Sequence, residues 1–209
     1  MPFWVVAVAL IAFACAGFMA TESAEWLAPR VAVRMAIVPL RHRVAISARI
    51  GLALATGVVG AVYFAHGTSA LGLAVVGLAC LTLDTACCLD VRLGRLPLAV
   101  TAPALSLASL VTLVGGGWLP LVITAAIVLP FAIAALISHG RNIAWSDVQL
   151  IAIGALVLNP ILGLMTLAAT CFAASGVAIA RRRTAEPIPF APYLATTIQL
   201  ALLSPGALR

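Results

Sequence analysis

The chain has 209 residues, of which 64% are hydrophobic and only 9% are charged, with a formal net charge of +6. Soluble domains carry about a quarter charged residues, so this composition excludes a water-soluble fold and tandem soluble domains. The apolar residues occur in blocks close to the roughly 20 residues that a helix needs to cross a bilayer. These features predict an all-α, polytopic transmembrane bundle.

About eight spans are predicted in chain order. They are expected at residues 2–20, 48–65, 69–89, 98–114, 118–138, 147–159, 161–180 and 188–205. The first is interpreted as a membrane helix and not as a signal peptide, because its arginines follow the apolar block instead of preceding it. The span at 147–159 is short for a bilayer crossing, which suggests that it lies partly within protein. We divide the chain into N-terminal spans at 1–68 and a membrane core at 69–209.

Arginines occur in every second predicted loop. These basic loops are residues 21–49, 90–97, 139–147 and 181–187. Because two spans separate each basic loop from the next, all four are expected on one side, and the positive-inside rule makes that side cytoplasmic. Both termini are then outside. The arginines are thereby assigned to topology and membrane lipids, and no nucleic-acid partner is predicted.

The first basic loop is predicted to be partly ordered at the membrane surface. Between residues 26 and 49 arginine alternates with apolar residues, which is typical of an amphipathic segment lying on the membrane, and Pro29 is suited to begin a helix there. Glu22, Glu25 and Glu186 are expected to be solvated side chains near these arginines.

Three aspartates stand within or at the end of apolar spans. A carboxylate at such depth costs several kcal/mol unless it is paired, hydrated or neutralised, so each is a functional candidate. Asp90 ends the third span and Asp147 opens the sixth, and the predicted topology puts both at the cytoplasmic edge. Two adjacent carboxylates can share a proton and activate a water molecule between them. The alternative is that each pairs with a nearby arginine: Asp90 with Arg92 or Arg95, and Asp147 with Arg141.

Asp84 lies six residues before Asp90 and faces another side of the same helix. We expect it to accept a hydrogen bond from Thr82, Thr85 or a neighbouring helix, with a catalytic role as the alternative.

Three segments together resemble the type IV prepilin peptidases, a family of intramembrane aspartic proteases. The family segment D-x-x-x-x-x-[IL]-P, with a threonine after it, is matched by Asp90, Leu96, Pro97 and Thr101. The segment D-V-K-L-hydrophobic-A-hydrophobic-G is matched from Asp147 to Gly154, except that Gln149 replaces the lysine. The segment I-P-F-G-P-[FY]-L-A is echoed at residues 188–195.

The resemblance implies a leader peptidase in which Asp90 and Asp147 are the catalytic pair. It implies that Pro97, Ser146, Pro189, Phe190 and Pro192 shape the substrate site. The implied substrate is a type IV prepilin-like precursor cut at the cytoplasmic face of the inner (cytoplasmic) membrane, which connects the chain to pilus assembly and protein secretion. No cofactor is implied, and a homodimer is left open.

Several family features are missing from the chain. Ala144-Trp145-Ser146-Asp147 replaces G-x-G-D, Leu98 replaces Asn or Asp, and Ala191 replaces Gly. Residues 21–49 contain no cysteine, so the chain resembles the short members and we do not assign the methyltransferase activity of the larger ones. The lost glycines leave open a degenerate relative that acts as a membrane scaffold or assembly subunit. A small proton-coupled transporter is a further alternative, disfavoured because the acids cluster at one face.

No metal site is predicted. The cysteines lie in apolar segments without C-x-x-C spacing, and the three histidines are scattered over loops on both faces.

Overall fold

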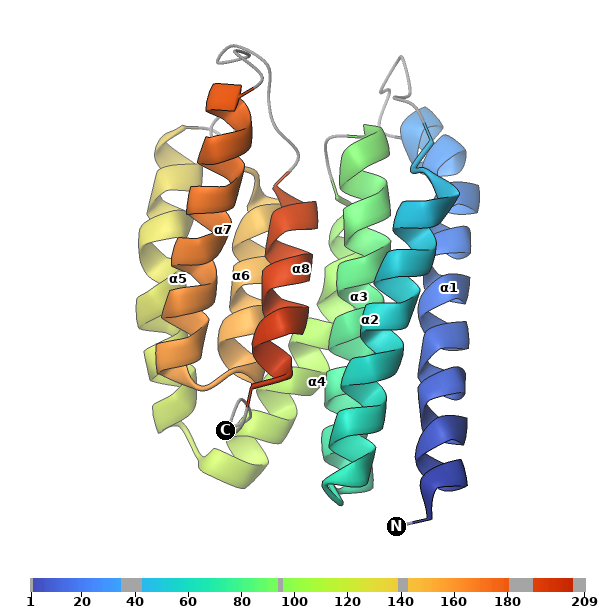
Figure 1. Cartoon of the computed structure of the whole chain (residues 1–209). Helices are drawn as coiled ribbons and strands as arrows, with labels where there is room; N and C mark the ends of the chain where they lie inside the picture. The colour runs from blue at the N-terminus through green and yellow to red at the C-terminus, as the bar shows by residue number, and fades with distance from the viewer. Residues whose placement is uncertain (1, 35–42, 94–95, 139–142, 181–189, 205–209) are drawn as a thin grey trace.

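The computed structural model describes residues 2–34, 43–93, 96–138, 143–180 and 190–204. These residues form eight helices that run alternately up and down in one bundle (Figure 1). The helices are α1 (Phe3–Arg34), α2 (Ile46–Ala65), α3 (Ala70–Leu93), α4 (Leu98–Gly116), α5 (Leu119–Ile137), α6 (Trp145–Val157), α7 (Pro160–Ala180) and α8 (Ala191–Leu202). The predicted all-α bundle is confirmed.

Proline and glycine mark several helix boundaries. Pro97, with φ −69° and ψ 138°, is the residue from which α4 begins, and Pro160 is the first residue of α7. Gly67 and Gly117 follow the ends of α2 and α4 with φ values of 71° and 70°, a conformation that side chains other than glycine rarely adopt. The N-terminal end of the chain and the C-terminal end of α8 lie toward the lower end of the bundle in Figure 1.

Six helices, α1 to α5 and α7, are long and apolar enough to cross a membrane. Large apolar side chains cover their outward surfaces, for example Leu110, Leu129 and Met165, which are 58%, 57% and 63% exposed. An apolar outer surface of this extent is suited to lipid and not to water. The chain is therefore a multi-pass membrane protein. The other two helices, α6 and α8, have 13 and 12 residues and pack within the bundle.

The boundary predicted for the first span was wrong. Instead of ending near residue 20, α1 continues for 32 residues to Arg34, so the first part of the predicted loop 21–49 is helical. Pro29 lies inside this helix and does not begin a new one. The acidic side chains of this extension pair with arginines of other helices: Glu22 with Arg49 of α2, and Glu25 with Arg92 of α3. Residues 35–42 of the predicted amphipathic segment lie outside the described residues.

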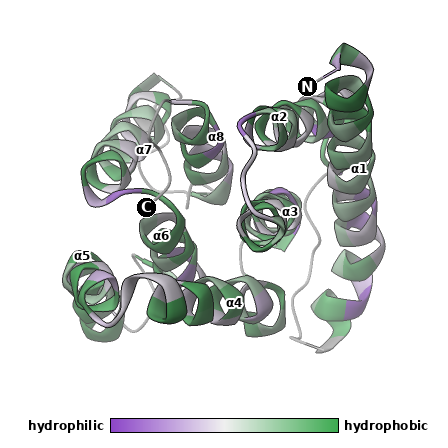
Figure 2. Ribbon diagram, turned by 90° about the horizontal axis from the view of Figure 1, so that it is seen from below, coloured by the Kyte–Doolittle hydropathy of each residue, from purple (hydrophilic) through white to green (hydrophobic). Residues whose placement is uncertain are grey.

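The third helix, α3, lies at the centre of the bundle. Seen along the bundle in Figure 2, α1 and α2 lie on one side of it and α4 to α8 on the other. It contacts α1, α2, α4, α6 and α8. The predicted segments 1–68 and 69–209 therefore pack directly against each other through α3.

Small residues allow α1 and α2 to pack closely. A Cβ atom at Gly57 would lie 2.8 Å from Ala14 Cβ and 2.9 Å from the backbone oxygen of Leu10. A Cβ atom at Gly60 would overlap the ring of Phe13. Close approach of this kind is how helices associate in lipid, where burial of apolar surface gives little driving force.

Candidate active site

Asp90 lies in the last turn of α3 and is 6% exposed. Its Oδ2 atom accepts a hydrogen bond from the backbone amide of Ala191, with an N···O distance of 3.0 Å. Ala191 is the first residue of α8, so the amide is one of those that the helix itself cannot satisfy. The carboxylate of Asp90 thus caps α8 from another helix, and the positive end of the α8 dipole faces it.

Asp147 lies in the first turn of α6 and is partly exposed. Its Oδ2 atom accepts a hydrogen bond from the amide of Ala144 at 3.3 Å, so the side chain folds back over the start of its own helix. A carboxylate is favourable at a helix N-terminus for the same electrostatic reason.

The fold brings Asp90 and Asp147 to the same place. The C-terminal end of α3, the start of α6 and the start of α8 all lie at the upper end of the bundle in Figure 1, and α3 contacts both α6 and α8. Burial raises the pKa of the Asp147 carboxyl group, and the negative charge of Asp90 contributes to the increase. Two acids separated by 57 residues along the chain are therefore close enough to repel each other when both are ionised.

Residues of the first two motif segments also meet across helices. The hydroxyl group of Thr101, in α4, donates to Oε1 of Gln149, in α6. Thr101 is fully buried, and its hydroxyl oxygen also lies 3.2 Å from the backbone oxygen of Leu98, so the single proton can be shared between the two acceptors. Gln149 follows Asp147 by two residues, so this bond fixes α4 beside the first turn of α6.

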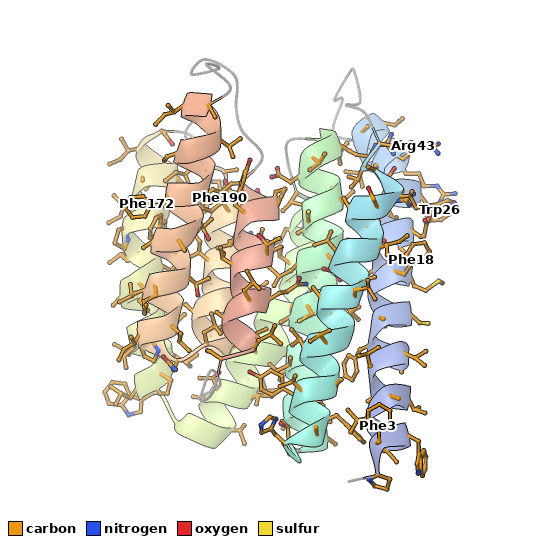
Figure 3. All side chains as sticks on the ribbon, viewed as in Figure 1. Phe3, Phe18, Trp26, Arg43, Phe172 and Phe190 are labelled. Carbon is orange, nitrogen blue, oxygen red and sulfur yellow. The ribbon has the colours of Figure 1, made fainter. Side chains whose placement is uncertain are left out.

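The predicted site-shaping residues lie at this end of the bundle where they are described. Pro97 begins α4, and Ser146 is 7% exposed in the first turn of α6. Phe190 precedes the first residue of α8 and lies toward the upper end of the bundle (Figure 3). Pro192 is the second residue of α8. Pro189 lies outside the described residues.

Arg92, one of the two arginines considered as partners of Asp90, has an acidic partner on α1. Arg92 Nη1 lies 2.7 Å from Glu25 Oε2, and both side chains are less than 10% exposed. The other oxygen of Glu25, Oε1, accepts the amide of Val44 at 3.1 Å. The expectation that Glu25 is solvated was therefore wrong, because the extended α1 carries it into contact with α3. Arg95, Arg141 and Glu186 lie outside the described residues.

Asp84 is fully buried and bonds to two neighbouring helices. Thr56 Oγ1, in α2, donates to Asp84 Oδ2 at 2.7 Å. Gln199 Nε2, in α8, donates to Asp84 Oδ1 at 2.8 Å and to Thr56 Oγ1 at 3.1 Å. Of the expected partners, the neighbouring helix is the one found, whereas Thr85 donates to the backbone oxygen of Leu81 in its own helix.

Three of these contacts were not predicted from the sequence. From the sequence, Ala191 was only the residue that replaces a family glycine, whereas in the structure its backbone amide donates to Asp90. Gln199 is 2% exposed. A single glutamine in an otherwise apolar segment could have been recognised from the sequence as a residue that needs a polar partner. Nothing in the sequence indicated the contact of Glu25 with Arg92, because the two residues lie 67 positions apart along the chain.

Among the described residues, no three or more His, Cys, Asp or Glu side chains are grouped so that they could hold a metal ion. The described cysteines are free thiols, with Cys80, Cys87 and Cys88 buried in α3 and Cys15 and Cys171 exposed on the outside of the bundle.

No family model matches the chain, and neither the curated proteins nor the solved structures include one that matches it significantly.

Proposed function

We propose that this protein is a membrane-embedded aspartic endopeptidase that removes the leader peptide of type IV prepilin-like precursors. The observation that carries the proposal is that the last turn of α3, with Asp90, and the first turn of α6, with Asp147, lie at the same end of the bundle, and α3 contacts α6. Each aspartate comes from a separate segment resembling the family. Support also comes from the third segment, whose first helical residue, Ala191, donates its amide to Asp90.

The proposed chemistry needs only the two carboxyl groups and water. One carboxylate takes a proton from a water molecule while the water oxygen attacks the scissile carbonyl carbon. The other carboxyl group, which is protonated, gives its proton to the carbonyl oxygen. The tetrahedral gem-diol intermediate then collapses. The nitrogen of the new N-terminus leaves with a proton from the first carboxyl group, and one hydroxyl of the gem-diol gives its proton to the second carboxylate, which restores the starting protonation of the pair. Sharing one proton before attack suits two neighbouring acids, because the repulsion between two negative charges is then avoided.

We place this reaction at the cytoplasmic face of the cell membrane. The arginines that the structure describes lie at or near the helix ends on the side of the bundle that holds Asp90 and Asp147, and the positive-inside rule assigns such a side to the cytoplasm; they are Arg30, Arg34, Arg43, Arg49 and Arg92. A prepilin-like precursor has a short leader followed by an apolar helix, so its scissile bond would lie at this boundary. The arginines at this end would repel a basic leader, and we assign them to lipid headgroups.

A second candidate is a relative that kept the fold but acts as a scaffold or assembly subunit. The replacement of G-x-G-D by Ala144-Trp145-Ser146-Asp147 favours it. In this case the two aspartates would serve only to cap α8 and α6.

Co-expression with a pilin-like precursor from the same genome separates these candidates. The measurement is the mass of the precursor and the sequence of its new N-terminus, with wild type, Asp90→Asn, Asp147→Asn and the matched control Glu22→Gln, which alters an acid on α1 outside the site. We expect cleavage by wild type and Glu22→Gln, and a loss of about a hundredfold or more in the two aspartate variants. Cleavage that survives both substitutions excludes the dyad, and a wild type that cleaves no precursor supports the scaffold.

A further inference from the structure

A second buried carboxyl group lies on α3, outside the proposed dyad. Asp84, Thr56 and Gln199 form a closed ring of three hydrogen bonds that joins α3, α2 and α8. Asp84 and Thr56 are fully buried, and Gln199 is 2% exposed. In an apolar bundle such a ring is costly to break, because no water is at hand to satisfy the separated groups.

The backbone of α1 lies close to two members of this ring. A Cβ atom at Gly17, on α1, would lie 3.1 Å from Asp84 Oδ2 and 3.2 Å from Thr56 Cβ. The ring is thus formed by three helices, and the backbone of α1 packs closely against Asp84 and Thr56.

The same two helices, α3 and α8, are joined a second time at the site. The amide of Ala191 binds Asp90 at the upper end of α8, and Gln199 binds Asp84 eight residues further along. Eight residues of helix span about 12 Å, and the six residues between Asp84 and Asp90 span about 9 Å. Because α8 runs antiparallel to α3, the hydrogen bond between Gln199 and Asp84 opposes sliding or rotation of α8 relative to α3.

We propose that Asp84 and Gln199 are positioning residues, which fix the register of α8 on α3 and thereby hold the Ala191 amide on Asp90. The inference rests on the proposed function, since it assigns these two residues a purpose within that site. The two carboxyl groups of α3 then have different roles. Asp90 belongs to the proposed site, and Asp84 holds α8 in position through Gln199.

The first test compares Gln199→Ala with the matched control Thr197→Val. Thr197, also on α8, makes an interhelical hydrogen bond of 2.6 Å to Thr170 of α7, so the control weakens the attachment of α8 without touching α3. A misplacement of about 1 Å can lower kcat by about a hundredfold. We therefore expect Gln199→Ala to lower kcat at least about tenfold with KM within about threefold, whereas Thr197→Val changes neither by more than about threefold. Equal kcat values for the two variants would overturn the proposal.

Asp84 is tested by a conservative and a disruptive substitution. Asp84→Asn keeps an oxygen that accepts from Gln199, so we expect cleavage to be retained, while Asp84→Leu should lose kcat as Gln199→Ala does. Loss of cleavage in Asp84→Asn, with the protein folded and Asp84→Leu no worse, would show that the carboxyl group itself acts and would overturn a positioning role.

Deuterium uptake at the start of α8 tests the register without reference to cleavage. In lipid nanodiscs, the segment at residues 190–195 should exchange faster in Gln199→Ala than in wild type and in Thr197→Val. Unchanged exchange in Gln199→Ala would overturn the inference even if kcat fell. A wild type that cleaves no precursor would remove the proposed function alone, because the exchange result would still show whether Gln199 holds α8 on Asp90.

Discussion

The carboxylate of Asp90 accepts the backbone amide of Ala191 across 101 residues of sequence, at an N···O distance of 3.0 Å. This bond gives Asp90 a structural role in addition to the proposed catalytic one. The structural role needs an oxygen acceptor, whereas the catalytic role needs an ionisable acid, and the two can be separated by substitution.

Asp90→Asn should therefore preserve the fold while removing cleavage. The asparagine oxygen can still accept the Ala191 amide, whereas Asp90→Ala leaves a buried donor without a partner, which costs about 1–3 kcal/mol. Thermal unfolding of the purified protein in detergent should show Asp90→Asn close to wild type and Asp90→Ala clearly lower. If the two variants unfold together, the amide is satisfied in some other way and does not depend on this side chain.

The two ion pairs of α1 should contribute very differently to stability. Glu25→Ala leaves Arg92 buried without an opposite charge, a change that typically costs about 3–5 kcal/mol. Glu22→Ala breaks the pair with Arg49, in which Glu22 is 44% exposed, and an exposed pair contributes about 1 kcal/mol or less.

The combined variant Glu25→Ala/Arg92→Met provides the check on this explanation. Because it removes the unpaired charge, it should be more stable than Glu25→Ala alone. Denaturation of the three variants under one set of conditions measures the difference. A combined variant that is less stable than Glu25→Ala would mean that Arg92 stabilises the bundle without Glu25.

Glycine substitutions on α2 should separate close helix packing from helix propensity. Gly57→Ala and Gly60→Ala place a methyl group against Leu10, Ala14 or Phe13 of α1, so we expect a loss of about 1–3 kcal/mol from overpacking. At Gly51 nothing lies within 4 Å of the added atom, and alanine there should gain about 0.5–1 kcal/mol of helix stability. Thermal midpoints of the three variants, measured side by side, should fall on opposite sides of wild type.

Restoring the family glycines beside Asp147 should change cleavage little. Ala144 has φ −76° and ψ 148°, and Ser146 lies within α6, so neither position requires glycine for its backbone conformation. We expect Ala144→Gly/Ser146→Gly to cleave within about threefold of wild type and to lose about 1 kcal/mol of stability from added chain entropy. A wild type without activity that becomes active in this variant would instead support the scaffold candidate.

The positions of the helices could largely be predicted from the sequence. Apolar blocks of span length, ended by Pro97, Gly117 or Pro160, follow directly from the cost of exposing backbone groups to lipid. The arginine pattern placed Asp90 and Asp147 at the same end, and in the structure the ends of α3 and α6 that carry them do lie together. Span length, helix breakers and sidedness are local properties, and a single chain is enough to determine them.

The contacts between helices were decided only by the tertiary structure. Whether Arg92 meets an aspartate or Glu25, and whether Asp84 turns to its own helix or to Thr56 and Gln199, depends on which helices pack beside α3. The ion pairs of Glu22 with Arg49 and of Glu25 with Arg92 depended on the same packing, since the arginines belong to α2 and α3. The physical reason is that a buried polar group takes the nearest partner in space, and the partners here lie 27 to 143 residues away along the chain.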